Sequence, residues 1–496
     1  MTSTDISIII LAAGKGTRMR SELAKVLHRA GGRSLIEHVI RACQPLKPGQ
    51  IVAVVGHQAE AVAAAVGELD LRIPVQTVVQ QPQRGTGHAM QVARRAIRKS
   101  ARLAVVLPGD APLLRTETLA ALVDTHRRGE AAATILSAEL ADPAGYGRIV
   151  RDSEGRVLAI VEDKALTPEQ REIREVNSSI YCFTLEKLWP CLAALRPDNA
   201  HRELYLTDAI ALLRQRNERV LAYIAGDPNE VVGCNTRAHL ADADRVFRAR
   251  KAAELMDSGA TIYLPETVVI DPDVTAGSDT VIEPGVRLLG KTRIGARCQI
   301  GAGSVLIDMR VDDDVTVLPQ TNLVSSRIGA KAQVGPFARL RPGCEVRAGA
   351  HVGTFVEMKN TTLGEGAKAP HLSYLGDATI GAETNVGAGT ITCNYDGFAK
   401  YETKIGRRVF IGSDSALVAP VRIGAGAYVA AGSVITENVP ADALAIARGR
   451  QANKLGWARQ RRLALKKDAK PKAASRAKSR SKSRPKRAAR KKSRRR

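Results

Sequence analysis

In the stretch Ile294-Gly-Ala-Arg-Cys-Gln-Ile300-Gly-Ala-Gly-Ser-Val-Leu306, an aliphatic residue returns at every sixth position. A period of six fits neither an amphipathic helix nor a half-buried strand, and it is the signature of hexapeptide repeats. The sequence therefore predicts a left-handed parallel β-helix, in which each coil presents one apolar side chain per face to a shared interior. The repeating positions are Ile282, Leu288, Ile294, Ile300, Leu306, then Ile328, Val334, Leu340, Val346, Val352, Met358, then Ile380, Val386, then Ile405, Ile411, Leu417, Ile423, Val429 and Ile435.

Glycine follows many of these aliphatic residues, as in Ile294-Gly295. It suits the tight corner between two faces, where a Cβ would be in the way. The register slips between Met358 and Leu363, which are five residues apart, and it is interrupted by the insert Cys393–Glu402. Insertions in a repeat array map to loops on one face, often the binding face. We therefore expect a functional site near these two places.

The net charge of +25 is concentrated at the C-terminus. Residues 466–496 hold seventeen Lys or Arg against one Asp, which gives this tail +16 and leaves about +9 for the other 465 residues. With almost nothing to bury, the tail is expected to be disordered. It is either a solvated extension or a salt-dependent, sequence-blind contact for polyanions. Base stacking is not expected, because the tail has no aromatic residue.

Seven scattered cysteines form no CxxC pair, which indicates a reducing cytoplasm and argues against a structural zinc site. No apolar run approaches membrane-spanning length, and the first residues lack the sections of a signal peptide. We therefore expect a cytoplasmic protein without membrane insertion.

Short apolar runs alternate with helix-like stretches in the N-terminal half. This alternation predicts a parallel, Rossmann-like α/β sheet with helices on both faces. Ligands of such sheets bind at the carboxyl ends of the strands, so the loops after Leu11 and Leu107 are candidate sites. The runs are Ile6–Leu11, Ile51–Val55, Val75–Val79, Leu103–Leu107 and Ala131–Leu136.

The chain divides into five expected parts. One long helix over residues 236–258, with Leu240, Ala243, Phe247 and Leu255 on a common stripe, joins the α/β domain to the β-helix. The expected parts are residues 1–235, the linker helix 236–258, the β-helix 259–450, a helical arm 451–465 and the tail 466–496.

The loop after the first apolar run reads Leu11-Ala-Ala-Gly-Lys-Gly-Thr-Arg-Met19. Its backbone N–H groups can face phosphates, and Lys15, Arg18 and Lys25 add positive charge. It is not a P-loop, because no Gly-Lys-Ser/Thr closes a four-residue gap. It is not a Rossmann fingerprint either, because Met19 stands at the position of the third glycine. Alone, such a turn is as consistent with a plain connection as with a phosphate site.

Asp110 leaves a carboxylate at the end of the run Leu103–Leu107. Magnesium prefers one or two carboxylates plus waters and substrate phosphates, so Asp110 is a candidate ligand. The alternative is a helix cap or turn former before Pro112.

Together these elements resemble a known family. The motif LAAGKGTRM, Lys25, Gln80, the run Gly85-Thr86-Gly87-His88-Ala89 and Gly109-Asp110 are similar to those of sugar-nucleotide pyrophosphorylases. The run Gly145–Ile149 with Glu162, Asn177 and Asn235 narrows the resemblance to N-acetylglucosamine-1-phosphate uridyltransferases. With the hexapeptide region attached, residues 5–457 resemble the bifunctional enzymes that also carry glucosamine-1-phosphate N-acetyltransferase activity.

The resemblance implies roles for residues of the α/β domain. Phosphoryl transfer needs alignment and charge stabilisation, for which Arg18 and Lys25 are the candidates. Two positions depart from the family pattern: Ala24 stands where proline is common, and Ser179 stands where glycine is usual. The resemblance implies that Mg²⁺ is held by Asp110 and Asn235, and that Asn235 also contacts the substrate. The amino sugar would be held by Gly147, Glu162 and Asn177. The implied nucleotide-binding residues are Leu11, Ala12, Ala13, Gly14, Lys25, Gln80, Gly85 and Thr86, with Gly109 beside them.

His371 is the candidate general base of the repeat half, where His351 is the only other histidine. An unperturbed imidazole can take a proton from a reacting amine near neutral pH. A lone histidine is more often structural, but the surrounding HLSYLGD and the downstream GAGTITCNYDG are similar to the acetyltransferase site of this family. By that resemblance, His371 deprotonates the amine as it attacks the thioester of acetyl-CoA.

The resemblance also implies the remaining acetyltransferase residues, with Cys393 serving packing rather than nucleophilic attack. Arg341 and Lys359 would bind the sugar phosphate, Tyr374 and Asn385 the sugar, and Ala388, Asn394, Tyr395, Ser413, Ala431 and Arg448 the acetyl-CoA.

Two other enzyme classes agree less well with the sequence. A monofunctional sugar-1-phosphate nucleotidyltransferase would use the β-helix only as an assembly scaffold, and the polar residues around His371 speak against it. A metal-dependent enzyme of the γ-carbonic-anhydrase type needs three histidine ligands, and the repeat region has two. The resemblance therefore implies a bifunctional enzyme that acetylates glucosamine 1-phosphate and then joins the product to UTP, releasing pyrophosphate, and it also implies the homotrimeric assembly of that family. Its product would be UDP-N-acetylglucosamine for cell-wall precursors.

Overall fold

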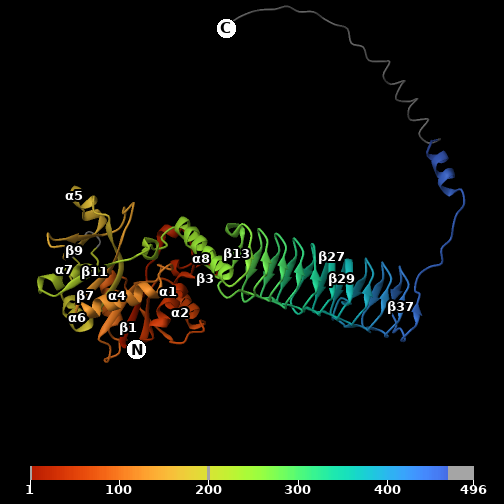
Figure 1. The fold of residues 1–496 in the computed structure, drawn as a ribbon, viewed down its shortest axis with the longest axis horizontal. Helices are drawn as coiled ribbons and strands as arrows, with labels where there is room; N and C mark the ends of the chain where they lie inside the picture. The colour runs from red at the N-terminus through yellow and green to blue at the C-terminus, as the bar shows by residue number, and fades with distance from the viewer. Residues whose placement is uncertain (1–2, 198–201, 467–496) are drawn as a thin grey trace, which may run out of the picture. The chain divides into compact units, whose positions relative to one another are not determined.

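The computed structural model describes residues 3–197 and 202–466 (Figure 1). Contacts divide the chain into a unit that ends at Ala445 and a separate unit that begins at Ile446. The predicted helical arm is present as a helix over residues 457–466. The predicted disordered tail lies outside the described residues from position 467 onward.

The N-terminal domain is built on one sheet with the strand order β11-β7-β10-β6-β1-β4-β5. β1 pairs in parallel with β4 and β6, β4 with β5, and β7 with β11, as the alternating pattern predicts. The bounds are β1 Ser3–Ala12, β4 Pro48–Val55, β5 Val75–Val79, β6 Leu103–Pro108, β7 Ala133–Glu139, β10 Glu175–Thr184 and β11 Val220–Ile224.

One strand that the sequence pattern did not predict, β10, departs from the parallel arrangement and runs antiparallel to both β6 and β7. A parallel neighbour needs a long crossover, usually a helix. Between β7 and β10 the chain instead forms the hairpin of β8 (Arg148–Arg151) and β9 (Val157–Val161) and the short α5 (Pro168–Arg171), and so returns antiparallel.

Helices cover both faces of this sheet, as predicted. One apolar core joins β1 to α1, α2 and α4, and a second core on the other face joins β1 and β4 to α3, α6 and α7. The bounds are α1 Leu35–Cys43, α2 Ala59–Gly67, α3 Thr86–Ala93, α4 Thr116–Arg128, α6 Leu185–Ala194 and α7 Asp208–Gln215.

Residues 261–445 form the predicted left-handed β-helix, whose coils present three faces (Figure 1). The first face contains β12 Thr261–Ile262, β15 Val281–Ile282, β18 Gln299–Ile300, β21 Thr316–Val317, β24 Gln333–Val334, β31 Asn385–Val386, β34 Phe410–Ile411, β37 Tyr428–Val429 and β39 Leu444–Ala445. The second contains β13 Val269–Ile270, β16 Arg287–Leu289, β19 Val305–Ile307, β22 Asn322–Val324, β25 Arg339–Leu340, β32 Ile391–Cys393, β35 Ala416–Val418 and β38 Val434–Ile435. β27 (His351–Lys359) and β29 (Lys368–Gly376) run through both of these faces. The third contains β14 Thr275–Ala276, β17 Arg293–Ile294, β20 Arg310–Val311, β23 Arg327–Ile328, β26 Glu345–Val346, β28 Thr362–Leu363, β30 Ala378–Ile380, β33 Thr403–Ile405 and β36 Val421–Ile423.

All the repeating aliphatic residues point inward, and none of them is more than 5% exposed. The gap in the pattern after Leu306 is not a gap in the fold, because Val311, Val317 and Leu323 take the inward positions there. At the corner after Ile294, a Cβ on Gly295 would lie 2.7 Å from the backbone nitrogen of Asp313. Glycine is therefore required there by the close approach of the next coil.

The five-residue step after Met358 is not peculiar to that place. Equal steps occur from Leu306 to Val311, from Leu323 to Ile328 and from Leu375 to Ile380, always where the chain passes from the second face to the third. Our interpretation of this slip as a mark of a site is therefore wrong. The insert Cys393–Glu402 is different, because it lengthens the same step to thirteen residues between Thr392 and Ile405.

The helix α8 (Arg237–Asp257) connects the two halves. Its predicted apolar stripe serves two cores: Leu240, Ala243 and Phe247 pack against the N-terminal domain, and Leu255 packs into the β-helix. Arg248 also forms an ion pair of 2.6 Å with Asp271 of the first coil.

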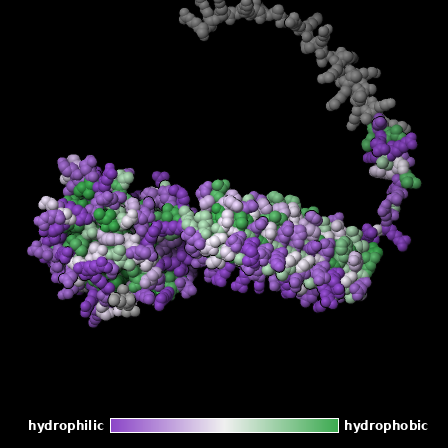
Figure 2. Space-filling view, viewed as in Figure 1, coloured by the Kyte–Doolittle hydropathy of each residue, from purple (hydrophilic) through white to green (hydrophobic). Residues whose placement is uncertain are grey.

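On the face shown in Figure 2, charged and polar residues predominate over the N-terminal domain, and hydrophobic surface appears over the last coils of the β-helix. Exposed Val434 and Leu444 belong to these coils. Exposed apolar surface of this kind marks contact sites more often than free surface.

Candidate active sites

A cleft of about 630 Å³ lies at the carboxyl ends of β1, β5 and β6, where open α/β sheets bind ligands. Every predicted nucleotide-binding residue except Gly109 lines this cleft. Gly109 instead donates its backbone N–H to the carbonyl of Leu11, a lining residue, at 2.9 Å. The predicted residues in the wall are Leu11, Ala12, Ala13, Gly14, Lys25, Gln80, Gly85 and Thr86, together with Asp110.

The glycine loop is shaped to face an anion. Gly16 has a φ of 61°, and a Cβ there would lie 2.6 Å from the Cβ of Lys25, so only glycine fits. Within the described part of the chain, the backbone N–H groups of Gly14 and Lys15 have no acceptor. Free N–H groups beside a lysine form an anion-binding concavity.

Four charged or polar side chains meet at one edge of the cleft. The amide oxygen of Asn235 accepts from Arg18 at 2.9 Å and from the Nζ of Lys25 at 3.2 Å. The same Nζ binds a carboxylate oxygen of Asp110. A carboxylate and an amide oxygen thus face one cation, and this donor set suits a hard metal ion whose shell is completed by water and phosphate. Asp110 and Asn235, the two predicted magnesium ligands, therefore offer oxygen donors of the kind that Mg²⁺ prefers.

The predicted amino-sugar residues also lie together. The N–H of Asn177 donates to the carbonyl of Gly147 at 2.8 Å, and a Cβ on Gly147 would lie 3.7 Å from a carboxylate oxygen of Glu162. The hydroxyl of Thr207 donates to Glu162 at 3.2 Å. Burial raises the pKa of Glu162. The side-chain amide of Asn177 donates to Tyr181 at 2.9 Å, which fixes its orientation.

The two departures from the family pattern have local explanations. Ala24 has a φ of −53°, which a proline would share, but its N–H donates to the side chain of Gln58 at 2.9 Å. Ser179 has a φ of 63°, in the left-handed region that favours glycine, and it lines the cleft. The site therefore keeps a glycine-like backbone without a glycine.

In the β-helix, His371 shares a column with three predicted acetyl-CoA residues. His371, Ala388, Ser413 and Ala431 each stand two positions after an inward residue of the first face, one coil apart, at the corner to the second face. Backbone hydrogen bonds join these corners, as from Asp414 to Ala388 at 2.7 Å and from Gly432 to Ser413 at 2.8 Å. Asn385 lies on the first face beside this column.

The local fold also accounts for the placement of His371. It stands in the middle of β29, opposite Thr354 of β27. A Cβ on Gly353 would lie 1.9 Å from the carbonyl oxygen of Pro370, so glycine alone lets the two strands approach there. The pKa of the neighbouring His351 is lowered by burial and then by the charge of His371.

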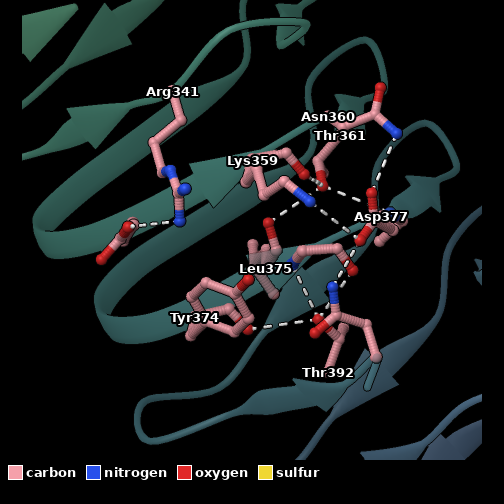
Figure 3. Close-up of polar contacts among 12 residues, drawn as sticks. Arg341, Lys359, Asn360, Thr361, Tyr374, Leu375, Asp377 and Thr392 are labelled. Atoms are coloured by element: carbon pink, nitrogen blue, oxygen red, sulfur yellow. Dashed lines mark hydrogen bonds and ion pairs between the residues drawn. The ribbon is translucent and has the colours of Figure 1, made fainter. Parts of the chain in front are cut away.

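The predicted phosphate ligands stack on the second face (Figure 3). Arg341 and Lys359 occupy equivalent positions of successive coils, and Arg341 donates its N–H to Met358 at 2.8 Å. Arg341 lies 3.5 Å from Glu357, and Lys359 lies 3.3 Å from Asp377. Tyr374 follows on the next coil, opposite Glu357.

Sequence reasoning missed Asp377 and Lys400. Asp377 accepts from Asn360 at 2.9 Å and from the amide of Asn394. Burial opposes its ionisation, but hydrogen bonds from Asn360, Asn394 and Lys359 hold its pKa below the ordinary value. Asp377 directly follows the motif HLSYLG, and this neighbourhood is the sequence signal that could have identified it as a site residue.

Lys400 comes from the insert and lies beside Lys359. Hydrogen bonding and charge repulsion from Lys359 lower the pKa of Lys400. Within the insert, Tyr395 and Lys400 form an antiparallel β-bridge. Phe398 lies between them in the chain, and 96% of its surface is exposed. A cavity of about 420 Å³ lies between Lys400–Glu402 and the coils that hold Asn360 and Asp377. Arg448 follows the last coil in the sequence and belongs to the separate unit that begins at Ile446.

Comparison with known proteins agrees with both halves. A model of the MobA-like NTP transferase domain matches residues 8–207, and a model of the bacterial transferase hexapeptide matches residues 402–437. "Bifunctional protein GlmU" of Koribacter versatilis is 48% identical over 470 residues, which cover 94% of this chain and 99% of that protein.

The chain belongs to the bifunctional GlmU family. GlmU of Solibacter usitatus is 49% identical, covering 92% of this chain and 97% of that protein, and GlmU of Corynebacterium diphtheriae is 46% identical, covering 92% and 94%. The protein is accordingly a bifunctional acetyltransferase and uridyltransferase of UDP-N-acetylglucosamine synthesis, as the sequence predicts. The alternative of a monofunctional nucleotidyltransferase with a scaffolding β-helix is not supported.

Family membership also suggests a divalent metal, UTP and acetyl-CoA as reactants, and an oligomeric assembly. Residues 3–197 and 202–466 contain no group of three or more His, Cys, Asp or Glu side chains that could together hold a metal ion. No helix in the part of the chain that the structure describes has the length and apolar character to cross a membrane.

Proposed function

We propose that the β-helix acetylates glucosamine 1-phosphate and that the α/β domain then uridylylates the product. The observation that carries this assignment is the grouping of residues. Nearly all those expected to bind the nucleotide line one cleft, and those expected for acetyl transfer, apart from Arg448, lie along neighbouring coils of the β-helix. Two sites on separate structural domains can work in succession because the product of the first reaction is the substrate of the second.

In the acetyl transfer, the amine of the sugar attacks the thioester carbonyl of acetyl-CoA. The new bond joins nitrogen to carbon, the carbon–sulfur bond breaks, and the amine proton passes to an imidazole nitrogen of His371. Arg341, Lys359 and Lys400 supply positive charge for the sugar phosphate, and Tyr374 and Asn385 contact the sugar. Acetyl-CoA extends along Ala388, Ser413 and Ala431, with Asn394 and Tyr395 beside it. No covalent acyl-enzyme is required, and Cys393 serves packing.

In the uridylyl transfer, an oxygen of the sugar phosphate attacks the α-phosphate of UTP, and pyrophosphate leaves. The glycine loop and Gln80 hold the nucleotide, while Gly147, Glu162 and Asn177 hold the N-acetylated sugar. Arg18 and Lys25 neutralise the charge that develops on the leaving pyrophosphate. Asp110 and Asn235 hold Mg²⁺, which when bound neutralises phosphate charge.

We infer a homotrimer in which the β-helices contact one another. Phe337, Phe355 and Leu372 take the same corner position in successive coils, with φ values of 55°, 58° and 36°. Bulky residues rarely adopt such a conformation, yet here it presents Phe355 at 60% and Leu372 at 63% exposure. The rings of Phe337 and Phe355 stack with centroids 5.5 Å apart. We call these three residues the apolar ridge, which adjoins His371.

The remaining expectations are part of the same proposal. The domain bounds are 1–235, 236–258, 259–450, 451–465 and 466–496. The protein works in the cytoplasm, where seven free thiols are stable. The basic tail contacts polyanions weakly and without sequence preference. Deleting residues 466–496 should therefore leave both activities intact and remove salt-sensitive retention on a polyanion column.

The pair of substitutions His371→Ala and Asp110→Ala tests the assignment of the two sites. We expect His371→Ala to abolish acetyl transfer and spare uridylyl transfer, and Asp110→Ala to do the reverse. Normal acetylation by His371→Ala would show that the base assignment is wrong.

A further inference from the structure

Gln80 stands at the end of β5 and is held on several sides. Only 4% of its surface is exposed, and that part belongs to the wall of the cleft. Its backbone N–H donates to the carbonyl of Val55 at 2.8 Å. The side-chain amide is therefore the part of Gln80 that a ligand in the cleft can reach.

The orientation of this amide is set by two acceptors. Its nitrogen donates to the carbonyl of Gly85 at 2.9 Å and lies 3.2 Å from the Nδ1 of His88. An amide oxygen in the same place would meet a lone pair of the Gly85 carbonyl, so the flipped orientation is disfavoured. The oxygen of Gln80 has no donor among the residues that the structure describes. It is available as an acceptor for a ligand.

His88 can accept this hydrogen bond only if its Nδ1 carries no proton. It stands in the first turn of α3, where burial and the charge of Arg84 lower its pKa. The lowered pKa favours the neutral imidazole, which presents a lone pair at Nδ1 when its proton is on Nε2. In this state it enforces the orientation of the Gln80 amide, whereas an imidazolium would compete for the amide oxygen.

We propose that His88 is a positioning residue that holds the amide oxygen of Gln80 toward the cleft and thereby selects nucleotides whose base offers an N–H donor. The imide of uracil has such a donor at N3, flanked by two carbonyls. Cytosine has an unprotonated nitrogen at the same position, so it would meet the Gln80 oxygen lone pair against lone pair. A buried polar group that is left unpaired in this way discriminates strongly between otherwise similar ligands.

This inference rests on the proposed contact between Gln80 and the nucleotide base. The backbone N–H of Gly85, which has no acceptor within the described ranges, offers a donor next to that contact. A donor beside an acceptor matches the edge of uracil better than either group alone. Gly85 itself has a φ of 95°, and a Cβ there would lie 2.6 Å from the carbonyl of Leu204. The backbone of Gly85, whose carbonyl accepts from the amide of Gln80, is therefore held in place.

Three variants of the full-length protein test the role of His88. His88→Phe keeps a ring and His88→Leu keeps an apolar side chain, but neither has an acceptor; His88→Asn can place an amide oxygen near the position of Nδ1. Steady-state uridylyl transfer is measured with UTP and with CTP. For the Phe and Leu variants we expect the KM for UTP to rise about three- to tenfold with kcat nearly unchanged, since one neutral hydrogen bond is lost. The preference for UTP over CTP in kcat/KM should fall about fivefold or more, and His88→Asn should retain it.

Equal loss with UTP and CTP in all three variants would overturn the proposal, because it would indicate a purely structural histidine. An unchanged UTP preference in the Phe and Leu variants would overturn it as well. Gln80→Ala separates this failure from that of the base contact. If Gln80→Ala keeps the wild-type KM for UTP and the wild-type preference, then Gln80 does not touch the base, and the proposed nucleotide site itself is wrong.

Discussion

The ammonium of Lys25 lies 3.2 Å from the amide oxygen of Asn235, although 210 positions separate the two residues in the chain. Lys25 also binds Asp110 at the end of β6. A cation thus already occupies the place between the two oxygen ligands that we assign to Mg²⁺. Among the acetyltransferase residues, the carboxylate of Asp377 is instead paired with Lys359 at 3.3 Å and accepts hydrogen bonds from Asn360 and Asn394.

Chelation should therefore separate the two activities. We expect EDTA to abolish uridylyl transfer and to leave acetyl transfer unchanged, because only the first reaction uses Asp110 and Asn235 as metal ligands. Each half-reaction is measured alone, with and without chelator, and Mg²⁺ is then restored. Loss of acetyl transfer on chelation, or uridylyl transfer that persists without metal, would contradict the assignment.

Ser179 pays a conformational cost that glycine would not. A non-glycine residue with a φ near 63° costs about 1 kcal/mol, against which glycine loses about 0.5–1 kcal/mol of chain entropy. We expect Ser179→Gly to be neutral or to stabilise by up to about 1 kcal/mol. The matched control is Ser153→Gly in the β8–β9 turn, where φ is not positive and a loss of about 0.5–1 kcal/mol is expected. Equal destabilisation by both changes in urea unfolding would argue against strain at Ser179.

His126 should make the N-terminal domain acid-sensitive. Its ring nitrogens lie 3.0 Å from the hydroxyls of Thr134 and Thr184. Burial, then the charge of Arg127, lowers its pKa to about 4 from the ordinary 6.5. The unfolded chain therefore binds a proton between pH 6.5 and 4 that the folded chain does not, and stability falls as the pH falls through this window. The loss approaches about 3 kcal/mol at the acid end.

This acid sensitivity can be measured through Trp189 of α6. In a Trp457→Phe background, its fluorescence reports urea unfolding of the N-terminal domain. His126→Gln should flatten the dependence of the unfolding free energy on pH by about one proton. The Trp457→Phe protein with His126 intact is the control and should show the full slope. An unaltered slope in His126→Gln would mean that His126 does not titrate in this window.

The apolar ridge should be required for assembly. Burying an exposed phenylalanine contributes about 1.5–3 kcal/mol, so Phe337→Ser with Phe355→Ser should weaken trimer association more than tenfold. Sedimentation at several protein concentrations measures this, and acetyl transfer should fall with the trimer while uridylyl transfer persists. Leu158→Ser, at an exposed position of β9, is the matched control and should change neither. An intact trimer in the double variant would exclude the ridge as the contact.

Much of the fold could be predicted because the hexapeptide pattern is local. Each inward residue is recognised by its distance of six positions from the preceding one. The pattern was missed where this distance shortens to five, as between Leu306 and Val311. The direction of β10 could not be predicted in this way. A strand's neighbours in a sheet depend on the path of the chain through β8 and β9, which no local pattern encodes.

The candidate sites show the same limit. The glycine loop, Lys25 and Asp110 belong to recognisable motifs, and their resemblance to a family assigned them to one reaction. The structure places them around one cleft. Lys400 carries none: it reaches Lys359 only because the insert folds back on itself between Tyr395 and Lys400. The φ of Ser179 is equally invisible in the sequence, since serine rarely signals a left-handed backbone.

The division of labour between the two domains is the central claim, and a mixing experiment tests it most directly. His371→Ala and Asp110→Ala are each given glucosamine 1-phosphate, acetyl-CoA, UTP and Mg²⁺, and formation of UDP-N-acetylglucosamine is followed. We predict that neither variant alone makes the product and that an equal mixture does, because the acetylated intermediate passes from one protein to the other. Product formation by either variant alone, or no product from the mixture, would contradict the account.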